Sequence, residues 1–72
     1  MKKYDAEKFS KNLRKLRQQK GLSQKALSEQ AGVSLYWIQV CEKGKGRRGL
    51  GQLVVIADFF DVTTDDLCIE KL

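Results

Sequence analysis

At 72 residues the chain is long enough for one domain, residues 1–72, and too short to enclose a sizeable active site. With 14 Lys and Arg against 9 Asp and Glu it carries a formal net charge of +5, which favours a polyanionic partner. Two cysteines and no histidine are too few for a disulfide framework or a closed zinc site, so we expect free thiols and no metal or cofactor.

The charges are segregated along the chain. From Met1 to Lys25 there are nine bases and two acids, whereas Asp58 to Glu70 holds five acids and no base. One end of the chain can therefore face phosphate and the other cannot. No apolar stretch approaches the ~20 residues that span a bilayer, and Lys2 and Lys3 are not followed by the apolar run of a signal peptide. We therefore expect a cytoplasmic protein.

A helix start signal occurs four times. In each case an apolar residue precedes a good N-cap residue and another apolar residue follows the cap by four positions, which forms a hydrophobic staple. Because proline is absent and glycines fall between the periodic segments, the pattern predicts short helices joined by tight turns. The four signals are Tyr4-Asp5-Phe9, Leu22-Ser23-Leu27, Val33-Ser34-Ile38 and Val62-Thr63-Leu67.

The first predicted helix runs from about Ala6 to Lys20 and ends at Gly21, with bases in its later turns, where they suit the helix dipole. The second runs from about Gln24 to Gln30, before Gly32 turns the chain. The third runs from about Leu35 to Lys43, and another glycine ends it. The positions expected to face the core are Ala6, Phe9, Leu13, Leu16, Leu27, Ala31, Ile38 and Cys41.

The stretch from Lys43 to Gly51 is rich in Gly, Lys and Arg and is predicted to be a loop. A fourth helix follows from about Leu50 to Phe60, and its start is the least defined because a glycine takes the cap position. The fifth runs from Thr64 to about Lys71 and presents Leu67 to the core, with two acids in its first turn. The core positions of the fourth helix are Leu53, Ile56, Ala57 and Phe60.

The second and third helices, joined through Gly32, form a predicted helix-turn-helix from about Gln24 to Lys43. A small side chain is needed where the two helices cross, and Ser28 meets this need. Gly32 meets the need for a residue that tolerates positive φ. The second helix of such a pair can enter the major groove of DNA. The apolar residues expected to fix the angle between the helices are Leu27, Val33, Ile38 and Cys41.

A longer pattern of residues runs through most of the chain. Its members are Leu13-Arg14-Lys15-Leu16-Arg17, Gly21-Leu22-Ser23-Gln24, Leu27-Ser28, Ala31-Gly32-Val33-Ser34, Ile38, Glu42-Lys43-Gly44-Lys45, Leu53, Ile56-Ala57, Val62 and Asp66-Leu67. In order and spacing this pattern resembles the lambda-repressor-like, Cro-type helix-turn-helix family, also called the XRE family. The resemblance implies a compact all-α fold of five helices, with the helix-turn-helix formed by the second and third.

The resemblance also implies which residues meet DNA. In similar proteins the position of Gln24 contacts a phosphate or helps to orient the recognition helix. The loop that matches Lys43 to Arg48 lies on the DNA backbone, and the pair that matches Arg17 and Glu42 forms a partly buried ion pair near the DNA-facing surface. The groove-facing positions of the family correspond to Ser34, Leu35, Tyr36, Gln39 and Val40.

The residues themselves favour the same surface. If Ile38 and Cys41 point inward, the remaining sides of the third helix carry candidate groove contacts at Leu35, Tyr36, Gln39, Val40 and Lys43. Free N–H groups at helix starts and bases on a glycine-rich loop can both bind phosphate. The candidate phosphate contacts are Ser23, Ser34, Lys45, Arg47 and Arg48, beside Gln24, which the resemblance alone implies.

The groove-facing side is more apolar than that of most DNA readers, whose base contacts are Arg, Lys, Asn and Gln. Leu35, Tyr36 and Val40 can still contact thymine methyl groups, and Gln39 can pair with adenine, so we expect a preference for A·T-rich sites. An exposed Leu-Tyr pair also suits protein packing. We interpret Trp37 as a structural residue that shields the helix crossing.

The sequence therefore predicts a DNA-binding transcriptional regulator, a repressor, which acts as a homodimer on a palindromic operator. Two other functions stay open. A protein-interaction module of the same fold, an antirepressor or an adaptor, would dock a partner on Leu35, Tyr36 and Val40, and an antitoxin would combine both roles. An enzyme is disfavoured because the sequence holds no nucleophile–base pair, metal cluster or phosphate loop.

Overall fold

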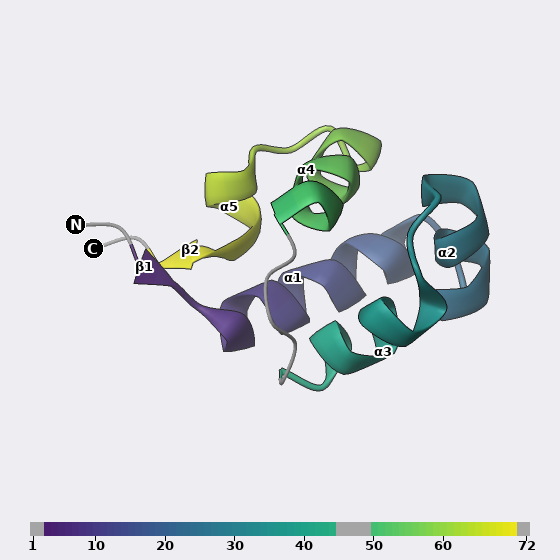
Figure 1. Ribbon diagram of the computed structural model, residues 1–72, viewed down its shortest axis with the longest axis horizontal. Coiled ribbons are helices and arrows are strands. Elements are labelled where there is room, and N and C mark those ends of the chain that lie inside the picture. The colour runs from purple at the N-terminus through teal and green to yellow at the C-terminus, as the bar shows by residue number, and fades with distance from the viewer. Residues whose placement is uncertain (1–2, 45–49, 71–72) are drawn as a thin grey trace.

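The computed structural model describes residues 3–44 and 50–70, and the side chains of residues 5–44 and 51–67. Five helices follow one another, and a short antiparallel strand pair joins the two ends of the chain (Figure 1). The predicted all-α architecture is confirmed, and all five helices start where the sequence places them. The elements are β1 (Lys3–Tyr4), α1 (Ala6–Gln19), α2 (Gln24–Ala31), α3 (Leu35–Glu42), α4 (Leu50–Phe59), α5 (Thr64–Cys68) and β2 (Ile69–Glu70).

The four predicted N-caps are all present. In each, the side-chain oxygen accepts a hydrogen bond from the amide three residues later, which satisfies a backbone donor that the helix cannot pair itself. The distances between side-chain oxygen and amide nitrogen are 3.0 Å for Asp5 to Lys8, 3.0 Å for Ser23 to Ala26, 3.3 Å for Ser34 to Trp37 and 3.0 Å for Thr63 to Asp66. Local sequence alone thus determines where these helices begin.

The end of the fifth helix is where the sequence prediction is wrong. α5 stops at Cys68 and does not continue to about Lys71, because β2 pairs with β1 and so takes up an extended conformation. The pairing is antiparallel, with Tyr4 opposite Ile69. It holds the two ends of the chain side by side (Figure 1).

The core lies around α1, which packs against α3 on one side and α5 on the other (Figure 1). Each fully buried Leu, Ile or Phe contributes about 1.5–3 kcal/mol through removal of its surface from water. Three residues expected to face the core, Ala6, Leu16 and Ala31, are only half-buried at its edge. The large side chains that are fully buried are Phe9, Leu13, Leu27, Ile38, Ile56 and Leu67, together with the smaller Cys41.

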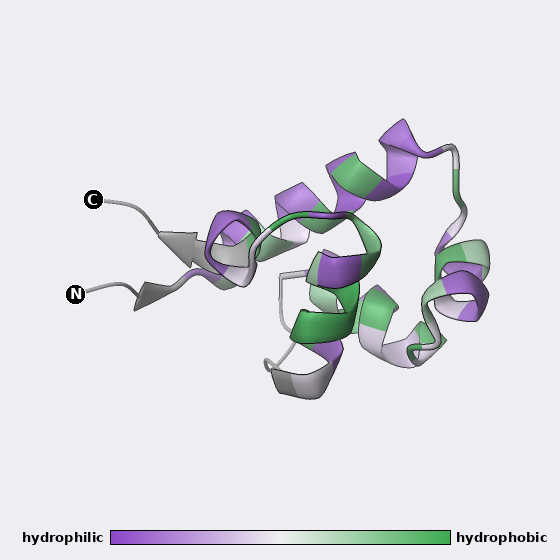
Figure 2. Ribbon diagram, turned by 90° about the horizontal axis from the view of Figure 1, so that it is seen from above, coloured by the Kyte–Doolittle hydropathy of each residue, from purple (hydrophilic) through white to green (hydrophobic). Residues whose placement is uncertain are grey.

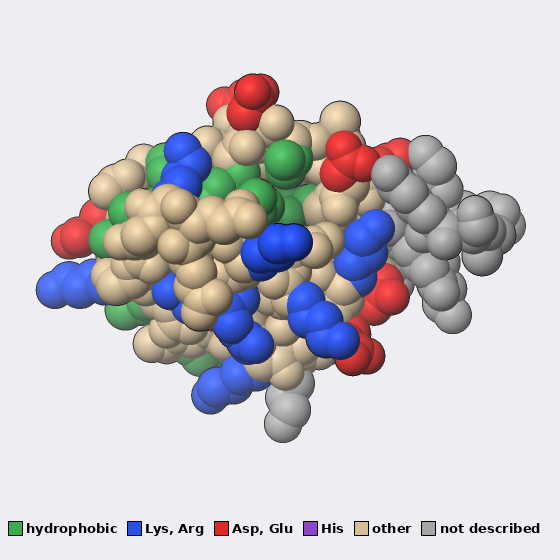
Figure 3. Space-filling view, turned by 180° about the vertical axis from the view of Figure 1, so that it is seen from behind, with side chains coloured by type: hydrophobic (Ala, Val, Ile, Leu, Met, Phe, Trp, Pro, Cys, Tyr) green, Lys and Arg blue, Asp and Glu red, His purple; other side chains and the backbone are tan. Residues whose placement is uncertain are grey.

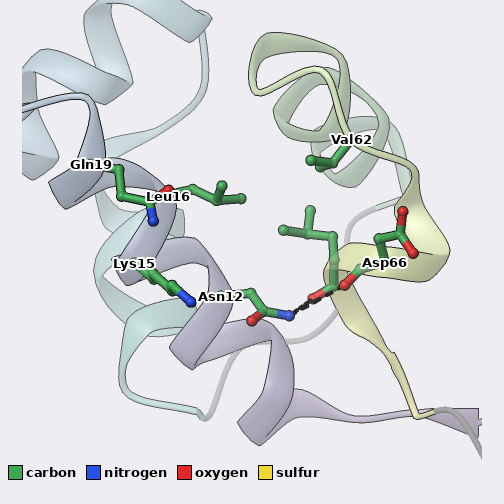
Figure 4. A pocket seen from close by; sticks show the side chains of 7 residues that line it. Asn12, Lys15, Leu16, Gln19, Val62 and Asp66 are labelled. Atoms are coloured by element: carbon green, nitrogen blue, oxygen red, sulfur yellow. Dashed lines mark hydrogen bonds between the residues drawn. The ribbon is translucent and has the colours of Figure 1, made fainter.

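A hydrogen-bonded contact ties α5 to α1. The Asn12 side-chain amide donates to the carbonyl of Leu67 at 3.0 Å and to that of Asp66 at 3.3 Å (Figure 4). These carbonyls lie near the end of a short helix, where no further turn can pair them. Leu16 and Val62 line the hollow that lies beside this contact (Figure 4). The contact thus holds the last helix in place against α1.

Trp37 and Cys41 are structural, as expected. The ring of the half-buried Trp37 packs against Phe9, with centroids 5.9 Å apart and an angle of 52° between the rings. The Cys41 thiol is buried, and burial, with the negative charge of Glu42 nearby, raises its pKa to about 11. Cys41 is therefore a protonated thiol at neutral pH and fills the core as a small apolar residue.

Two kinds of site are missing from the described part of the chain. None of its helices has the length and apolar character needed to cross a membrane. Its His, Cys, Asp and Glu side chains also form no group of three or more that could hold a metal ion.

Candidate nucleic-acid interface

Hydrogen bonds and buried side chains hold the turn between α2 and α3 in place. Gly32 ends α2 in the left-handed conformation, with φ of +73°, and its amide donates to the Ser28 carbonyl at 3.0 Å. The Ser28 hydroxyl donates in turn to the Val33 carbonyl. Leu27 and Ile38 are fully buried behind the turn. These contacts hold the two helices of the helix-turn-helix at a fixed angle.

The side of α3 opposite Ile38 and Cys41 faces outward. Tyr36 is 74% exposed, and the side chains of Gln39 and Lys43 are also exposed. Leu35 and Val40 flank them and are half-buried. The caps Ser23 and Ser34 are exposed at the starts of α2 and α3. The predicted contact residues within α3 thus lie on or beside its outward side.

A bidentate ion pair links α1 to the end of α3. Arg17 Nε lies 2.7 Å from Glu42 Oε2, and Arg17 Nη2 lies 2.9 Å from Glu42 Oε1. Glu42 is only 4% exposed, and the Arg17 side chain is 14% exposed. Arg17 Nη1 also donates to the Leu22 carbonyl at 2.9 Å, so the same side chain holds the turn before α2. One guanidinium therefore connects three segments of the fold.

Gln24 also contacts the Glu42 carboxylate. Its side-chain amide donates to Glu42 Oε1 at 3.2 Å, from the first residue of α2. The resemblance gave Gln24 two roles, a phosphate contact or the orientation of the recognition helix. The observed hydrogen bond joins the start of α2 to the end of α3, and both roles of Gln24 toward DNA stay predictions. Gln24 is half-buried.

Arg14 is a residue of this site that the sequence prediction missed. Its guanidinium donates to the Glu42 carbonyl and lies 3.6 Å from Glu42 Oε1, while half of the side chain stays exposed. The Ser10 hydroxyl donates to the same carbonyl at 2.7 Å. Both hydrogen bonds satisfy the Glu42 carbonyl at the end of α3, which the helix cannot pair itself. The sequence feature that could have identified Arg14 is its spacing to Arg17, since residues three apart share a helix face.

Burial and charge act in opposite directions on the Glu42 carboxyl. Burial alone raises its pKa, whereas the hydrogen bonds from Arg17 and Gln24 and the charges of Arg17 and Arg14 lower it. The net result is a pKa below the ordinary value of 4.5. The hydrogen bond to Glu42 likewise raises the pKa of Arg17, against the cost of burial. Both groups are charged at neutral pH.

We expect the free energy of unfolding to fall as the pH drops below 4.5, the ordinary pKa of a glutamate carboxyl. The folded protein keeps Glu42 ionised where the unfolded chain takes up a proton, so the stabilisation is complete above that pH and is lost as the pH falls through the lower folded pKa. Denaturant titrations at several pH values measure this loss. Glu42→Gln should remove it, whereas Glu29→Gln, at an exposed position of α2, should keep it. The same acid dependence in wild type and Glu42→Gln would contradict the pairing.

A polar hollow opens between α1, α2 and α3 next to this cluster. Arg14, Gln39 and Lys43 bring exposed donors to its rim, and they surround the neutralised Arg17–Glu42 pair. Its charged lining residues are three bases and one acid, so it attracts anions. Lys and Arg side chains are also spread over the face shown in Figure 3, while Asp and Glu lie at the edges of that view.

The predicted phosphate clamps of the loop, Lys45, Arg47 and Arg48, lie outside the described residues. Their role as phosphate contacts therefore stays a prediction from the sequence. Lys43, which the sequence predicts both as a groove contact and as the first residue of the loop, is the C-cap residue of α3.

Comparison with known proteins identifies the family. A family model described as a helix-turn-helix domain matches residues 9–67. The chain belongs to the helix-turn-helix domain family. The matched segment begins in α1 and ends in α5, so the family pattern includes all five helices. The resemblance expected from the sequence is confirmed.

Three similar proteins show how far the likeness of this helix-turn-helix chain extends. The transcriptional activator BcrR of Enterococcus faecalis is 42% identical over 59 residues, which are 82% of this chain and 29% of the relative, so the chain spans less than a third of that protein. The restriction-modification controller protein C.AhdI of Aeromonas hydrophila is 31% identical with a TM-score of 0.75, over 86% of this chain and 94% of the other. A hypothetical transcription factor from Neisseria, 24% identical, shares the fold with a TM-score of 0.77, over 86% of this chain and 71% of its own.

Proposed function

We propose that this protein is a sequence-specific regulator of transcription that binds duplex DNA with α3 in the major groove. The observation that carries the proposal is the outward face of α3, where Tyr36, Gln39 and Lys43 are exposed on a helix fixed by the Arg17–Glu42 pair. A rigid helix that presents polar donors beside a basic hollow can read base edges and bind phosphate together. A DNA partner also implies a location in the cytoplasm.

The proposed contacts divide by chemistry. Gln39 suits adenine, whose N6 and N7 it can pair with in a bidentate manner, and Tyr36 with the flanking Leu35 and Val40 suits thymine methyl groups. An A·T-rich half-site follows. Phosphates would bind at Lys43 and Arg14, at the helix starts marked by Ser23 and Ser34, and at the bases of the loop.

A salt titration tests this function through Lys43. We expect binding to duplex DNA to weaken steeply as salt rises, because each phosphate contact releases a counterion. Lys43→Ala should weaken binding to all sequences alike and lower the slope of log affinity against log salt by about one unit. Lys15→Ala removes the same charge from α1, beside the hollow that faces α5, and should leave the slope unchanged. No binding to DNA at low salt would refute the proposal.

We propose a homodimer on a palindromic operator, because two-fold binding doubles the contact that one small domain can make. The two half-sites would then lie one helical turn apart, ~10 bp. Repression is the sense that the sequence suggested, and it stays a prediction, since the Enterococcus faecalis relative is named an activator. A reporter gene with the operator placed over or upstream of the promoter distinguishes the two senses.

The exposure of Tyr36 also supports a second candidate, a protein-interaction module of the same fold. An antitoxin would combine this role with DNA binding. Substitutions separate these functions: loss of Lys45, Arg47 and Arg48 should abolish the activity of a DNA binder. Loss of Leu35 and Tyr36 alone should abolish that of an interaction module.

A further inference from the structure

A hollow lies between α1 and α5, on another side of α1 from the helix-turn-helix. We call it the α1–α5 hollow. It shares no lining residue with the polar hollow beside the Arg17–Glu42 pair, so it is separate from the proposed DNA interface. Its lining residues are Asn12, Lys15, Leu16 and Gln19 of α1, Val62 of the turn after α4, and Asp66 and Leu67 of α5.

The floor of the α1–α5 hollow is apolar, and its rim on α1 is polar. Leu16 and Val62 point toward each other across it (Figure 4), and both are only half-buried at the edge of the core. Along α1, hydrophobic segments alternate with hydrophilic ones (Figure 2). Lys15 and Gln19, four residues apart and exposed, share the helix face beside Leu16. Apolar surface next to hydrogen-bond donors suits an amphipathic molecule.

The fold of the chain leaves this polar rim unused. Within the described residues, the side chains of Lys15 and Gln19 form no hydrogen bond or ion pair. The next base of α1 is engaged, since the ammonium of Lys20 lies 5.3 Å from the centre of the Phe59 ring in a cation–π contact. Lys15 is therefore the base that the hollow can offer to a ligand.

Volume and charge together define the kind of ligand. The hollow has a volume of about 250 Å³, and one water takes about 30 Å³ of liquid, so roughly eight non-hydrogen atoms fit. The ammonium of Lys15 and the amide of Gln19 are both donors, which favours an anionic acceptor. Asp66 carries negative charge on the α5 side and repels an anion from there. An anionic head group would therefore lie on the α1 rim.

We propose that the α1–α5 hollow binds a short-chain carboxylate. The carboxylate lies at Lys15 Nζ and Gln19 Nε2, and the alkyl chain covers Leu16 and Val62. The inference goes beyond the proposed function, because it gives the protein a small-molecule site on a surface that the DNA interface does not use.

A ligand in this hollow would stabilise the folded chain. The hollow borders the contact in which Asn12 donates to the Leu67 carbonyl and holds α5 against α1. A ligand that binds the folded chain and not the unfolded one raises the stability by mass action. Because a domain of 72 residues is only marginally stable, the folded fraction would rise with it. The site would thus link the amount of active regulator to the concentration of a small carboxylate.

Heteronuclear NMR of the whole chain, with hexanoate as the probe, tests the site. Hexanoate should shift the side-chain amide signals of Asn12 and Gln19 and the backbone amide signal of Leu67. A ligand of this size should bind with a Kd in the millimolar range. Acetate lacks the chain and hexylammonium has the opposite charge, so each should bind at least about fivefold more weakly.

Two substitutions separate the head group from the chain. Lys15→Met keeps the apolar stem and removes the charge, which should weaken hexanoate binding about two- to fivefold, as for an exposed ion pair. Lys25→Met removes an exposed base from α2 and should bind as wild type does. Val62→Phe places a ring in the hollow and should abolish binding. Since Lys15 is exposed, Lys15→Met tests the site even where Val62→Phe fails to fold.

Thermal unfolding measures the link to stability. At a hexanoate concentration of ten times its Kd, the midpoint of wild type should rise by roughly 5–10 °C, the shift that mass action gives a domain of this size. The midpoint of Lys15→Met should rise less at the same concentration. No rise in wild type would contradict binding to the folded chain.

The outcomes distinguish this site from the DNA interface. At matched ionic strength, hexanoate should leave the DNA affinity of the folded protein unchanged. A wild type that binds hexanoate in the hollow but no DNA would support the site and refute the DNA-binding function alone. Equal affinity of wild type and Lys15→Met for hexanoate would overturn the site. Signal shifts confined to the exposed Val54 and Val55 of α4 would overturn it as well.

Discussion

Arg17→Ala should destabilise the protein by about 3 kcal/mol, the lower end of the cost of breaking a buried ion pair. The substitution leaves the Glu42 carboxylate, 4% exposed, without its bidentate partner, and frees the Leu22 carbonyl as well. Arg14 and Gln24 still contact Glu42 and keep the loss from being larger. Small domains hold only a few kcal/mol of stability in reserve, so this loss unfolds much of the population at 37 °C.

Urea denaturation with the single tryptophan as reporter measures this effect, because Trp37 packs against Phe9 in the core. Lys15→Ala, at an exposed base of the same helix, should leave the midpoint unchanged. A double variant, Arg17→Met with Glu42→Leu, should recover most of the stability, because an apolar pair of similar volume carries no desolvation cost. Affinity for DNA should fall in Arg17→Ala as well, since α3 loses its tie to α1. An unchanged midpoint in Arg17→Ala would contradict the structural role of the pair.

Gln39→Ala should weaken binding to the preferred site by roughly 5- to 150-fold, since a bidentate base contact contributes about 1–3 kcal/mol. Affinity for random duplex should change little, because that binding rests on phosphate contacts. The selected half-site should also become degenerate at one position, where the variant no longer distinguishes adenine.

Fluorescence anisotropy with preferred and random duplexes measures both affinities under the same salt conditions. Gln30→Ala is the matched control: it removes the same side chain from an exposed position of α2 on the same helix-turn-helix. It should keep the specificity of wild type. Equal losses on the two duplexes for Gln39→Ala would show that Gln39 does not contact a base.

The helix starts could be predicted from the sequence because their causes are local. Asp5, Ser23, Ser34 and Thr63 each cap a helix through an atom three residues away, so the signal lies within one turn of chain. The end of α5 could not be predicted in the same way. It depends on the pairing of Ile69 with Tyr4 at the opposite end of the chain, which has no local signature.

The same difference between local and long-range causes applies to the candidate site. The contact between Arg17 and Glu42 followed from a family resemblance, which carries long-range information that a single sequence lacks. Arg14 was missed because its strongest partner is a backbone carbonyl, and any residue at that position of α3 supplies one. The exposed Val54 and Val55 were also unforeseen, since apolar residues on a helix are expected to face the core.

The most direct test of DNA recognition by α3 is an in vitro selection of duplexes bound by the protein at low salt. We expect enrichment of palindromic sites whose half-sites are A·T-rich and lie ~10 bp apart, one turn of the double helix. Gln39→Ala should relax the selected sequence at one position of each half-site. Failure to enrich any sequence, or enrichment of G·C-rich sites alone, would contradict it.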